Sequence, residues 1–217
     1  GLAALRPSMH VVVARYIKPR TREHGCSYAL MVNKGREKFA DIFVSHCWNE
    51  NFPEFASTVN DALDEDDAIW VCSFALDQNA DITAQLGDDV LKSPFAVALE
   101  ESSEVIMVID GDVEPLKRTW CVLEMYLATL HSKRLDIWTH DWSPKLFKQM
   151  AAKVAHLDVR NCTASNPEDH SRIMSTVRGK EEEVNRTVQR NVSRAMKKVA
   201  AMSRDRDAKD DSGEEAE

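Results

Sequence analysis

The chain has 217 residues, of which 43% are hydrophobic and 29% are charged, and it carries a formal net charge of −8. This length and apolar content suit one globular domain with appendages rather than a disordered or fibrous chain. The acidic balance argues against a nucleic-acid-binding surface, which needs a basic stripe.

The regular part of the chain begins at Lys38. Residues 1–37 form an N-terminal extension, in which the apolar run Met9–Ala14 suits either a short strand or the end of a helix. Phe39–Ser45 is a near-continuous apolar run of strand length, which is typical of a strand buried on both faces. Asn51–Leu63 has apolar residues spaced along one face of a helix.

A second buried-type strand is predicted over Ala68–Phe74. The connection that follows, Ala75–Lys92, is long and polar, and long loops of this kind often carry function. Ser93 and Pro94 then provide an N-cap and a first helical position, so we expect a short helix that ends near Ser102.

The same alternation continues downstream. We expect a third buried strand over Val105–Ile109 and then a helix over residues 118–132 that contains Trp120 and Glu124. A fourth strand over Leu135–Thr139, a helix over residues 143–154 and a last short strand or edge segment over His156–Val159 follow. Strands that alternate with helices predict an α/β fold, here a flavodoxin-like open parallel sheet of four or five strands with helices on both faces, over residues 38–162.

The C-terminal part is predicted to be helical. A mostly apolar stripe runs from Asn166 to about Met202, with Gly179 as a possible break. This long helix either packs on the domain or serves as an arm for self-association, and the absence of a clean heptad pattern favours packing. Residues 163–203 form this helical segment, and residues 204–217 form an acidic tail that we expect to be disordered.

The five cysteines are an odd number and form no metal-type cluster, so we expect no metal site. Three of them lie in or beside apolar runs, where a free cysteine behaves as a small hydrophobe. We therefore expect a reducing, cytoplasmic location. No apolar run approaches the length of a membrane span, so no membrane insertion is expected.

Ligands in open α/β sheets bind beyond the carboxyl ends of the strands, and here these ends carry Ser45, His46 and Phe74. Trp120 and Glu124 share one helix face near such an end, and a carboxylate beside an aromatic ring is a plausible small-molecule site. The alternative, a solvated Glu and a core Trp, is favoured by spacing alone. His46 suits a functional or a structural role equally.

Other standard chemistries lack their motifs. There is no Walker-type or dinucleotide-binding glycine loop, no Gly-x-Ser-x-Gly elbow and no His-Glu-x-x-His motif. Cys121 at a helix start is a candidate nucleophile with His46 as its base, but a buried structural cysteine is the more frequent outcome in this setting.

Two motifs resemble a Toll/interleukin-1 receptor (TIR) domain. Asp41-Ile-Phe-Val-Ser-His46 is similar to that family's first strand, and Trp120-Cys-Val-Leu-Glu124 is similar to the helix that carries the catalytic Glu in NAD-cleaving members. The likeness covers residues 38–160 in element order. The Ser-His-x-Trp form at residues 45–48 is similar to TIR-like domains of protists and algae.

The resemblance implies cleavage of the nicotinamide–ribose bond of NAD⁺, which is a substrate here rather than a cofactor. Glu124 would stabilise the oxocarbenium-like transition state. The resemblance also implies residues that wall the pocket or belong to the loop that gates it and mediates self-association: Trp120, Ser45, His46, Trp48, Phe74 and Asp77. The partners implied are NAD⁺ and further copies or other TIR-like domains.

The chain also departs from the family pattern. His46-Cys47-Trp48 stands where the family often has an aromatic residue or Arg, and the loop over residues 75–92 is longer and lacks the usual Arg/Gly/Pro composition. Two alternatives therefore stay open. One is a non-catalytic TIR-like module that acts through protein contacts, and the other is a hydrolase or transferase that acts on a different N-glycoside.

Overall fold

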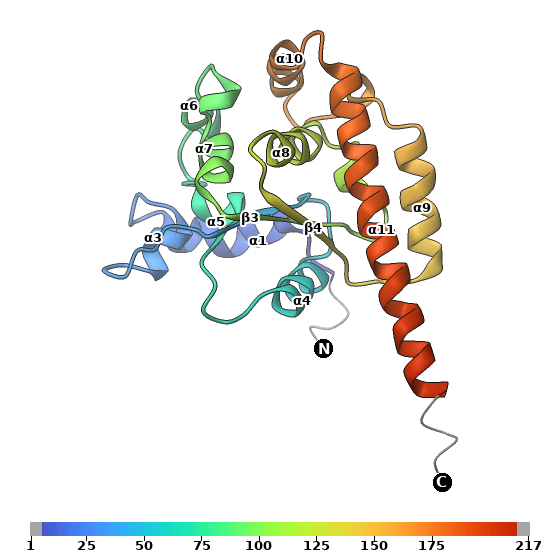
Figure 1. The fold of residues 1–217 in the computed structure, drawn as a ribbon. Coiled ribbons are helices and arrows are strands. Elements are labelled where there is room, and N and C mark those ends of the chain that lie inside the picture. The colour runs from blue at the N-terminus through green and yellow to red at the C-terminus, as the bar shows by residue number, and fades with distance from the viewer. Residues whose placement is uncertain (1–5, 212–217) are drawn as a thin grey trace.

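A computed structural model describes residues 6–211, with side chains described as far as residue 198. Its centre is a four-stranded sheet in which every strand is parallel and the order is β2–β1–β3–β4 (Figure 1). This order and the flanking helices confirm the predicted flavodoxin-like α/β fold. The strands are β1 Ile42–Ser45, β2 Ile69–Trp70, β3 Glu104–Val108 and β4 Arg134–Trp138.

Helices connect the strands and flank the sheet. The N-terminal part contains α1 Met9–Val12, the π-helix η2 Val13–Ile17, α2 Lys18–Thr21 and α3 Tyr28–Val32 before β1, then α4 Phe52–Ala62, α5 Cys72–Ala75, α6 Ile82–Leu86, the 3₁₀ helix η3 Val90–Lys92 and α7 Pro94–Glu101. The C-terminal part contains the 3₁₀ helix η4 Glu114–Lys117, α8 Thr119–Leu130, α9 Pro144–Ala155, the 3₁₀ helix η5 Val159–Asn161, α10 Pro167–Thr176 and α11 Glu181–Asp211.

The two faces of the sheet pack into separate cores, because successive side chains of a strand point to opposite faces. Phe43, Val105 and Met107 belong to the core formed with α7, α8, α9 and α11. Ile42 and Val44 belong to the core formed with α1, η2 and α4. Figure 1 shows these two helix groups on opposite sides of the sheet. The alternation also directs Ser45, two residues after Phe43, toward α8.

Helix α8 is the most enclosed helix of the domain. From Cys121 to Ala128 every side chain is buried, because the sheet lies on one side and α7 and α11 pack against the others. A helix that is apolar on nearly all sides belongs in a protein interior. Burying the carboxyl group of Glu124 in this helix therefore costs stability.

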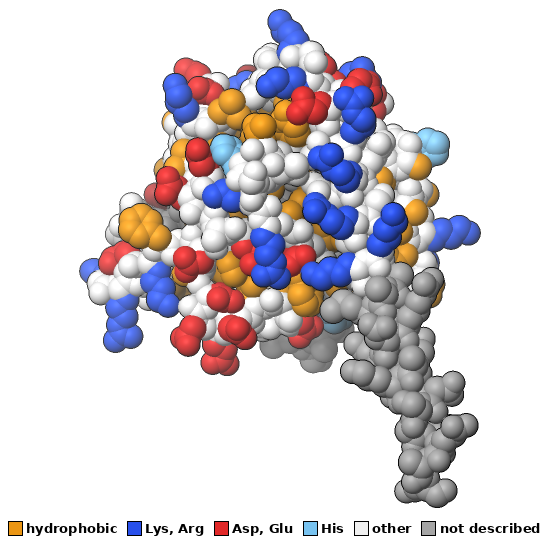
Figure 2. Space-filling model, in the orientation of Figure 1, with side chains coloured by type: hydrophobic (Ala, Val, Ile, Leu, Met, Phe, Trp, Pro, Cys, Tyr) orange, Lys and Arg blue, Asp and Glu red, His pale blue; other side chains and the backbone are white. Residues whose placement is uncertain are grey.

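Helix α11 packs on the domain with one face. Val184, Val188 and Val192 are fully buried against the core, whereas the outer face carries exposed basic side chains (Figure 2), among them Arg186 and Arg190. The apolar stripe predicted from the sequence is thus buried against the domain. Among the described side chains, α11 leaves no apolar seam for a helical arm.

Several predicted elements differ from the observed ones. The strand predicted over Ala68–Phe74 ends at Trp70, because the Val71 carbonyl accepts hydrogen bonds from the Phe74 and Ala75 amides and starts α5 instead. The connection 75–92 holds α6 and η3. The last predicted strand, His156–Val159, is instead the turn after α9 and the first residue of the 3₁₀ helix η5. The apolar run Met9–Ala14 is helical.

The predicted C-terminal helix is two helices. Gly179 adopts a left-handed φ of +78°, which favours glycine, and it separates α10 from α11. Helix α11 continues to Asp211, past the end predicted near Met202. The disorder predicted for residues 204–217 falls in part on residues 212–217, which lie outside the described residues. Within the described chain no helix is both long enough and apolar enough to span a membrane.

We expect Val188→Ala to lower the free energy of unfolding by about 2 kcal/mol, because it removes two methyl groups from a fully buried site between α11 and the core. Urea unfolding measures this change. The matched control is Val97→Ala on α7, where the side chain is 47% exposed and the effect should stay within about 0.5 kcal/mol. Equal effects from the two variants would contradict the packing of α11 on the domain.

Candidate functional site

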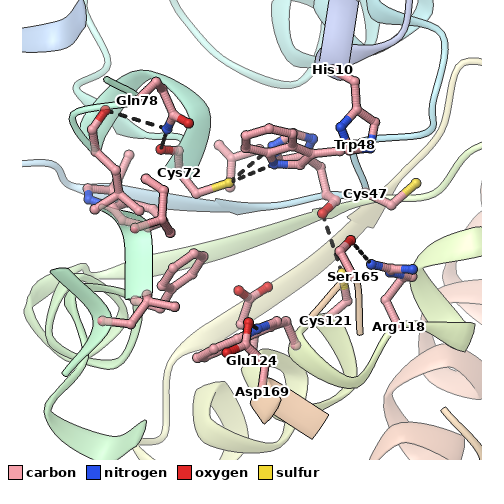
Figure 3. Close-up of a pocket in the computed structure, with 18 residues that line it drawn as sticks. His10, Cys47, Trp48, Cys72, Gln78, Arg118, Cys121, Glu124, Ser165 and Asp169 are labelled. Atoms are coloured by element: carbon pink, nitrogen blue, oxygen red, sulfur yellow. Dashed lines mark hydrogen bonds between the residues drawn. The ribbon is translucent and has the colours of Figure 1, made fainter. Parts of the chain in front are cut away.

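A cavity of about 240 Å³ opens at the carboxyl ends of β1 and β2 (Figure 3). Its walls come from the end of β1, the α5–α6 segment, α7, the start of α8, the start of α10 and α1. The lining residues are His10, Val44, His46, Cys47, Trp48, Trp70, Cys72, Leu76, Gln78, Ile82, Leu86, Phe95, Arg118, Trp120, Cys121, Glu124, Ser165 and Asp169. This is the place where open α/β sheets bind ligands.

Glu124 presents a buried carboxyl group to this cavity. It is 5% exposed, and its side chain accepts a hydrogen bond from the Ser45 hydroxyl at the end of β1. Burial raises the pKa of Glu124 to about 7, although the Ser45 hydrogen bond and the charge of His46 both lower it. Near neutral pH the carboxyl group therefore changes between its protonated and ionised forms.

An aromatic stack forms the wall beside Glu124. The ring of Trp120 lies 4.8 Å from that of Phe95 in a stacked geometry, and Phe95 meets Trp70 edge-on at 5.2 Å between ring centroids. The Trp120 indole N–H donates a hydrogen bond of 3.2 Å to Asp169 Oδ2, which holds the ring in place. A fixed aromatic face beside a carboxyl group suits a flat or cationic ring as ligand.

His46 is buried in the opposite part of the lining. Its Nδ1 is hydrogen-bonded to Glu50, and its ring centroid lies 4.6 Å from that of Phe55. Burial lowers the pKa of His46, but Glu50 and the hydrogen bond with Cys72 together outweigh burial, so this pKa lies well above its usual value. Trp48 lies beside it, with its indole N–H 3.2 Å from Cys72 Sγ.

The structure brings most of the predicted site residues together. Glu124, Trp120, His46 and Trp48 line the cavity. Ser45 is not itself a lining residue but reaches the site through its hydrogen bond to Glu124.

Phe74 and Asp77 lie outside the cavity lining. Phe74 packs on Tyr28, with 5.9 Å between the ring centroids, and Asp77 Oδ1 accepts a hydrogen bond from the Asn79 amide. Because α5 begins directly after β2, the turn of this helix directs other side chains of the segment inward, namely Cys72, Leu76 and Gln78.

Four lining residues come from segments that the sequence did not connect with the site. His10 belongs to α1 and Phe95 to the start of α7, whereas Ser165 precedes α10 and Asp169 lies in its first turn. The Asn166–Pro167 cap signals where α10 begins but not where it docks. Docking depends on Thr163, which exchanges backbone hydrogen bonds with the residues before and at the start of α8.

Cys121 has the surroundings of a structural cysteine. Its thiol donates to the His46 carbonyl oxygen at 3.4 Å, and burial raises its pKa well above the usual value. His46 Nε2 faces Cys72 rather than Cys121. A thiol that stays protonated and has no base is a poor nucleophile, so the alternative that pairs Cys121 with His46 loses its basis.

Among the residues with described positions, no three His, Cys, Asp or Glu side chains are grouped to hold a metal ion. Comparisons of this chain with models of protein families, with curated proteins and with solved structures found no match. The chemistry of the site therefore rests on the residues just described.

We expect Glu124→Gln to stabilise the fold above neutral pH. The folded-state pKa is raised, so the unfolded state releases its proton first, and ionising the buried carboxyl costs stability as pH rises from about 4.5 to 7. The amide avoids this cost and keeps an acceptor for Ser45. Unfolding free energies should show a gain over the parent that grows from pH 5 to pH 8 and approaches about 3 kcal/mol.

The control for this measurement is Glu101→Gln at the exposed end of α7. It should leave the pH dependence of stability unchanged. A pH-independent difference between the Glu124→Gln variant and the parent would mean that Glu124 ionises in the fold as readily as in the unfolded chain.

Proposed function

We propose that this chain is a TIR-like NAD⁺ glycohydrolase in which Glu124 is the catalytic residue. The observation that carries the proposal is a buried carboxyl group, with a pKa near 7, that faces a cavity beside the Trp120–Phe95 stack. The two motifs that resemble TIR domains, at Asp41–His46 and Trp120–Glu124, meet at this cavity through the hydrogen bond between Ser45 and Glu124.

The chemistry of NAD⁺ fits this arrangement. The nicotinamide ring carries a positive charge and leaves as a neutral molecule, so its departure needs no proton from the protein. The ribose that remains develops oxocarbenium character, which a nearby carboxylate stabilises. Glu124 acts in its ionised form, and the face of Trp120 binds the cationic ring before it leaves.

The size of the cavity indicates which part of the dinucleotide enters it. Pockets for drug-sized ligands have volumes of about 300–1,000 Å³. A cavity of about 240 Å³ therefore suits the nicotinamide–ribose end. In this proposal, the adenine end lies toward the mouth of the cavity.

The position of Glu124 also weighs against the non-catalytic alternative. A surface glutamate on an interaction module has no reason to be 5% exposed with a raised pKa, because burying an ionisable group costs stability. Perturbed titration in a cleft is typical of functional sites. The same carboxyl group would also serve cleavage of a different N-glycoside. Comparing substrates distinguishes that activity from NAD⁺ cleavage.

We expect the parent chain to release nicotinamide from NAD⁺ and Glu124→Gln to slow the release by about 100-fold or more, because the amide carries no charge for the transition state. Chromatographic measurement of nicotinamide at high protein concentration checks this. Glu101→Gln, on the exposed end of α7, should match the parent. Equal release by parent and Glu124→Gln would remove Glu124 as the catalyst.

In line with the TIR resemblance, the proposed activity depends on self-association. Nicotinamide release per mole of chain should therefore rise as the protein is concentrated or clustered. Absence of release from the parent at every concentration would favour the interaction module. If the chain releases the base from a different nucleoside but no nicotinamide from NAD⁺, this would favour an enzyme that acts on another N-glycoside.

The pH profile provides a further prediction. Since the ionised carboxyl group is the active form, kcat/KM should rise with pH through about 7 and then level off. Ser45→Ala removes a hydrogen bond that lowers the pKa of Glu124, so the rise should move to higher pH. A profile that falls through pH 7, or that Ser45→Ala leaves in place, would contradict this role for the carboxylate.

A further inference from the structure

A second reactive arrangement lies in the same cavity and is separate from Glu124. Cys72 Sγ is 3.7 Å from His46 Nε2, and the other ring nitrogen, Nδ1, is hydrogen-bonded to Glu50. Thiol, imidazole and carboxylate thus follow one another in the order of nucleophile, base and orienting group. Figure 3 shows Cys72 and Glu124 on different sides of the space between the labelled residues.

The hydrogen bonds decide where the proton between sulfur and imidazole resides. His46 Nδ1–H donates to Glu50, which fixes the ring orientation and leaves Nε2 facing the sulfur. Glu50 and the hydrogen bond with Cys72 together outweigh burial and raise the pKa of His46, so the ring favours holding both protons. Nε2 is the position at which the ring takes the proton of the thiol as the sulfur reacts.

The sulfur has a second hydrogen-bond partner. The Trp48 indole N–H lies 3.2 Å from Cys72 Sγ and donates to it. An N–H donor stabilises negative charge on sulfur as it does on oxygen, since donors to a charged form favour that form. The same indole is held in place by an edge contact with His10, 5.2 Å between ring centroids.

We propose that Cys72 is a nucleophilic thiol, with His46 as its base and Glu50 as the positioning residue, that is oxidised by small hydroperoxides entering the cavity. The thiolate attacks one peroxide oxygen, so an S–O bond forms and the O–O bond breaks. The leaving oxygen takes the proton from His46 Nε2, and the products are a sulfenic acid at Cys72 and water or an alcohol. Sulfur is oxidised and the peroxide is reduced.

The other cysteines offer no such site. Burial raises the pKa of Cys47, Cys121 and Cys162, so these thiols stay protonated. Cys26 is partly exposed and is not among the residues that line the cavity. Cys72 is 9% exposed overall, but it lines the cavity and is reached from there. Oxidation of Cys72 does not require NAD⁺ cleavage at Glu124.

The first test compares alkylation rates within one chain. Iodoacetamide is added to the native protein in limiting amount, and peptide mass mapping follows each cysteine over time. Cys72 should react about tenfold faster than Cys26, although Cys26 is the more exposed. A rate for Cys72 equal to or below that of Cys26 would overturn the proposal.

Two variants distinguish activation of the Cys72 thiol by its neighbours from mere access of the reagent to it. Glu50→Gln keeps a hydrogen-bonding group at Nδ1 but removes the charge, so the Cys72 rate should fall about tenfold while the Cys26 rate is unchanged. Trp48→Phe keeps an aromatic ring and removes the N–H donor, which should also slow Cys72.

Cys162 reports on folding, because it is buried and does not line the cavity. If Glu50→Gln exposes Cys162, Trp48→Phe alone decides the outcome. A Cys72 rate that stays at the parent value in a folded variant would overturn the assignment of roles.

The second test uses hydrogen peroxide followed by dimedone, which labels sulfenic acids. The label should appear on Cys72 at peroxide concentrations that leave Cys26 unlabelled, and Glu50→Gln should reduce it. A label on Cys26 alone would overturn the proposed oxidation. Cys72→Ser should lose the label at that position, which confirms the mapping.

Discussion

The hydrogen bond between Ser45 and Glu124 joins the end of β1 to the interior of α8, and the site is built around it. Helix α8 is enclosed on all sides, and a carboxyl group in such surroundings is costly unless it is paired or neutral. Ser45 supplies one partner, and the cavity leaves the rest of the group open to a ligand. The pKa near 7 results from burial, which raises it, and from the Ser45 hydrogen bond and the charge of His46, which both lower it.

The remaining walls depend on segments that dock against α8. Thr163 exchanges backbone hydrogen bonds with Lys117 and Thr119, which brings the start of α10 over the cavity. Asp169 of α10 then accepts from the Trp120 indole and is paired with Arg172. The orientation of the aromatic wall therefore depends on α10, a helix that follows all four strands in the sequence.

The fold was predictable because it is encoded in local patterns. Apolar runs of strand length marked β1 and β3, and Ser-Pro caps marked the starts of α7 and α9. The spacing of Trp120 and Glu124 indicated only a shared helix face, and the TIR resemblance assigned both residues to the cavity that they line. The end of β2 at Trp70 was missed, because the apolar run continues into α5 and apolar content does not distinguish a strand from a buried helical turn.

What the sequence did not provide was contact between distant segments. Phe74 and Asp77 were assigned to the site through the resemblance to the loop that gates TIR domains, whereas the structure places both side chains outside the cavity lining. The contacts of Asp169 with Trp120 and of Cys72 with His46 arise from tertiary packing, for which one sequence carries no local signal. His46 is where the two parts of the cavity meet, since its ring contacts Cys72 and its charge lowers the pKa of Glu124.

The most direct measurement of the central claim is a carbon-13 NMR titration of the Glu124 carboxyl group, assigned by its loss in Glu124→Gln, with and without NAD⁺. We predict a midpoint near 7 in the free protein. We also predict a lower midpoint with NAD⁺ bound, because the cationic nicotinamide ring favours the carboxylate. A midpoint near the ordinary value of 4.5 that NAD⁺ leaves unchanged would contradict both the buried carboxyl group and the substrate proposed for it.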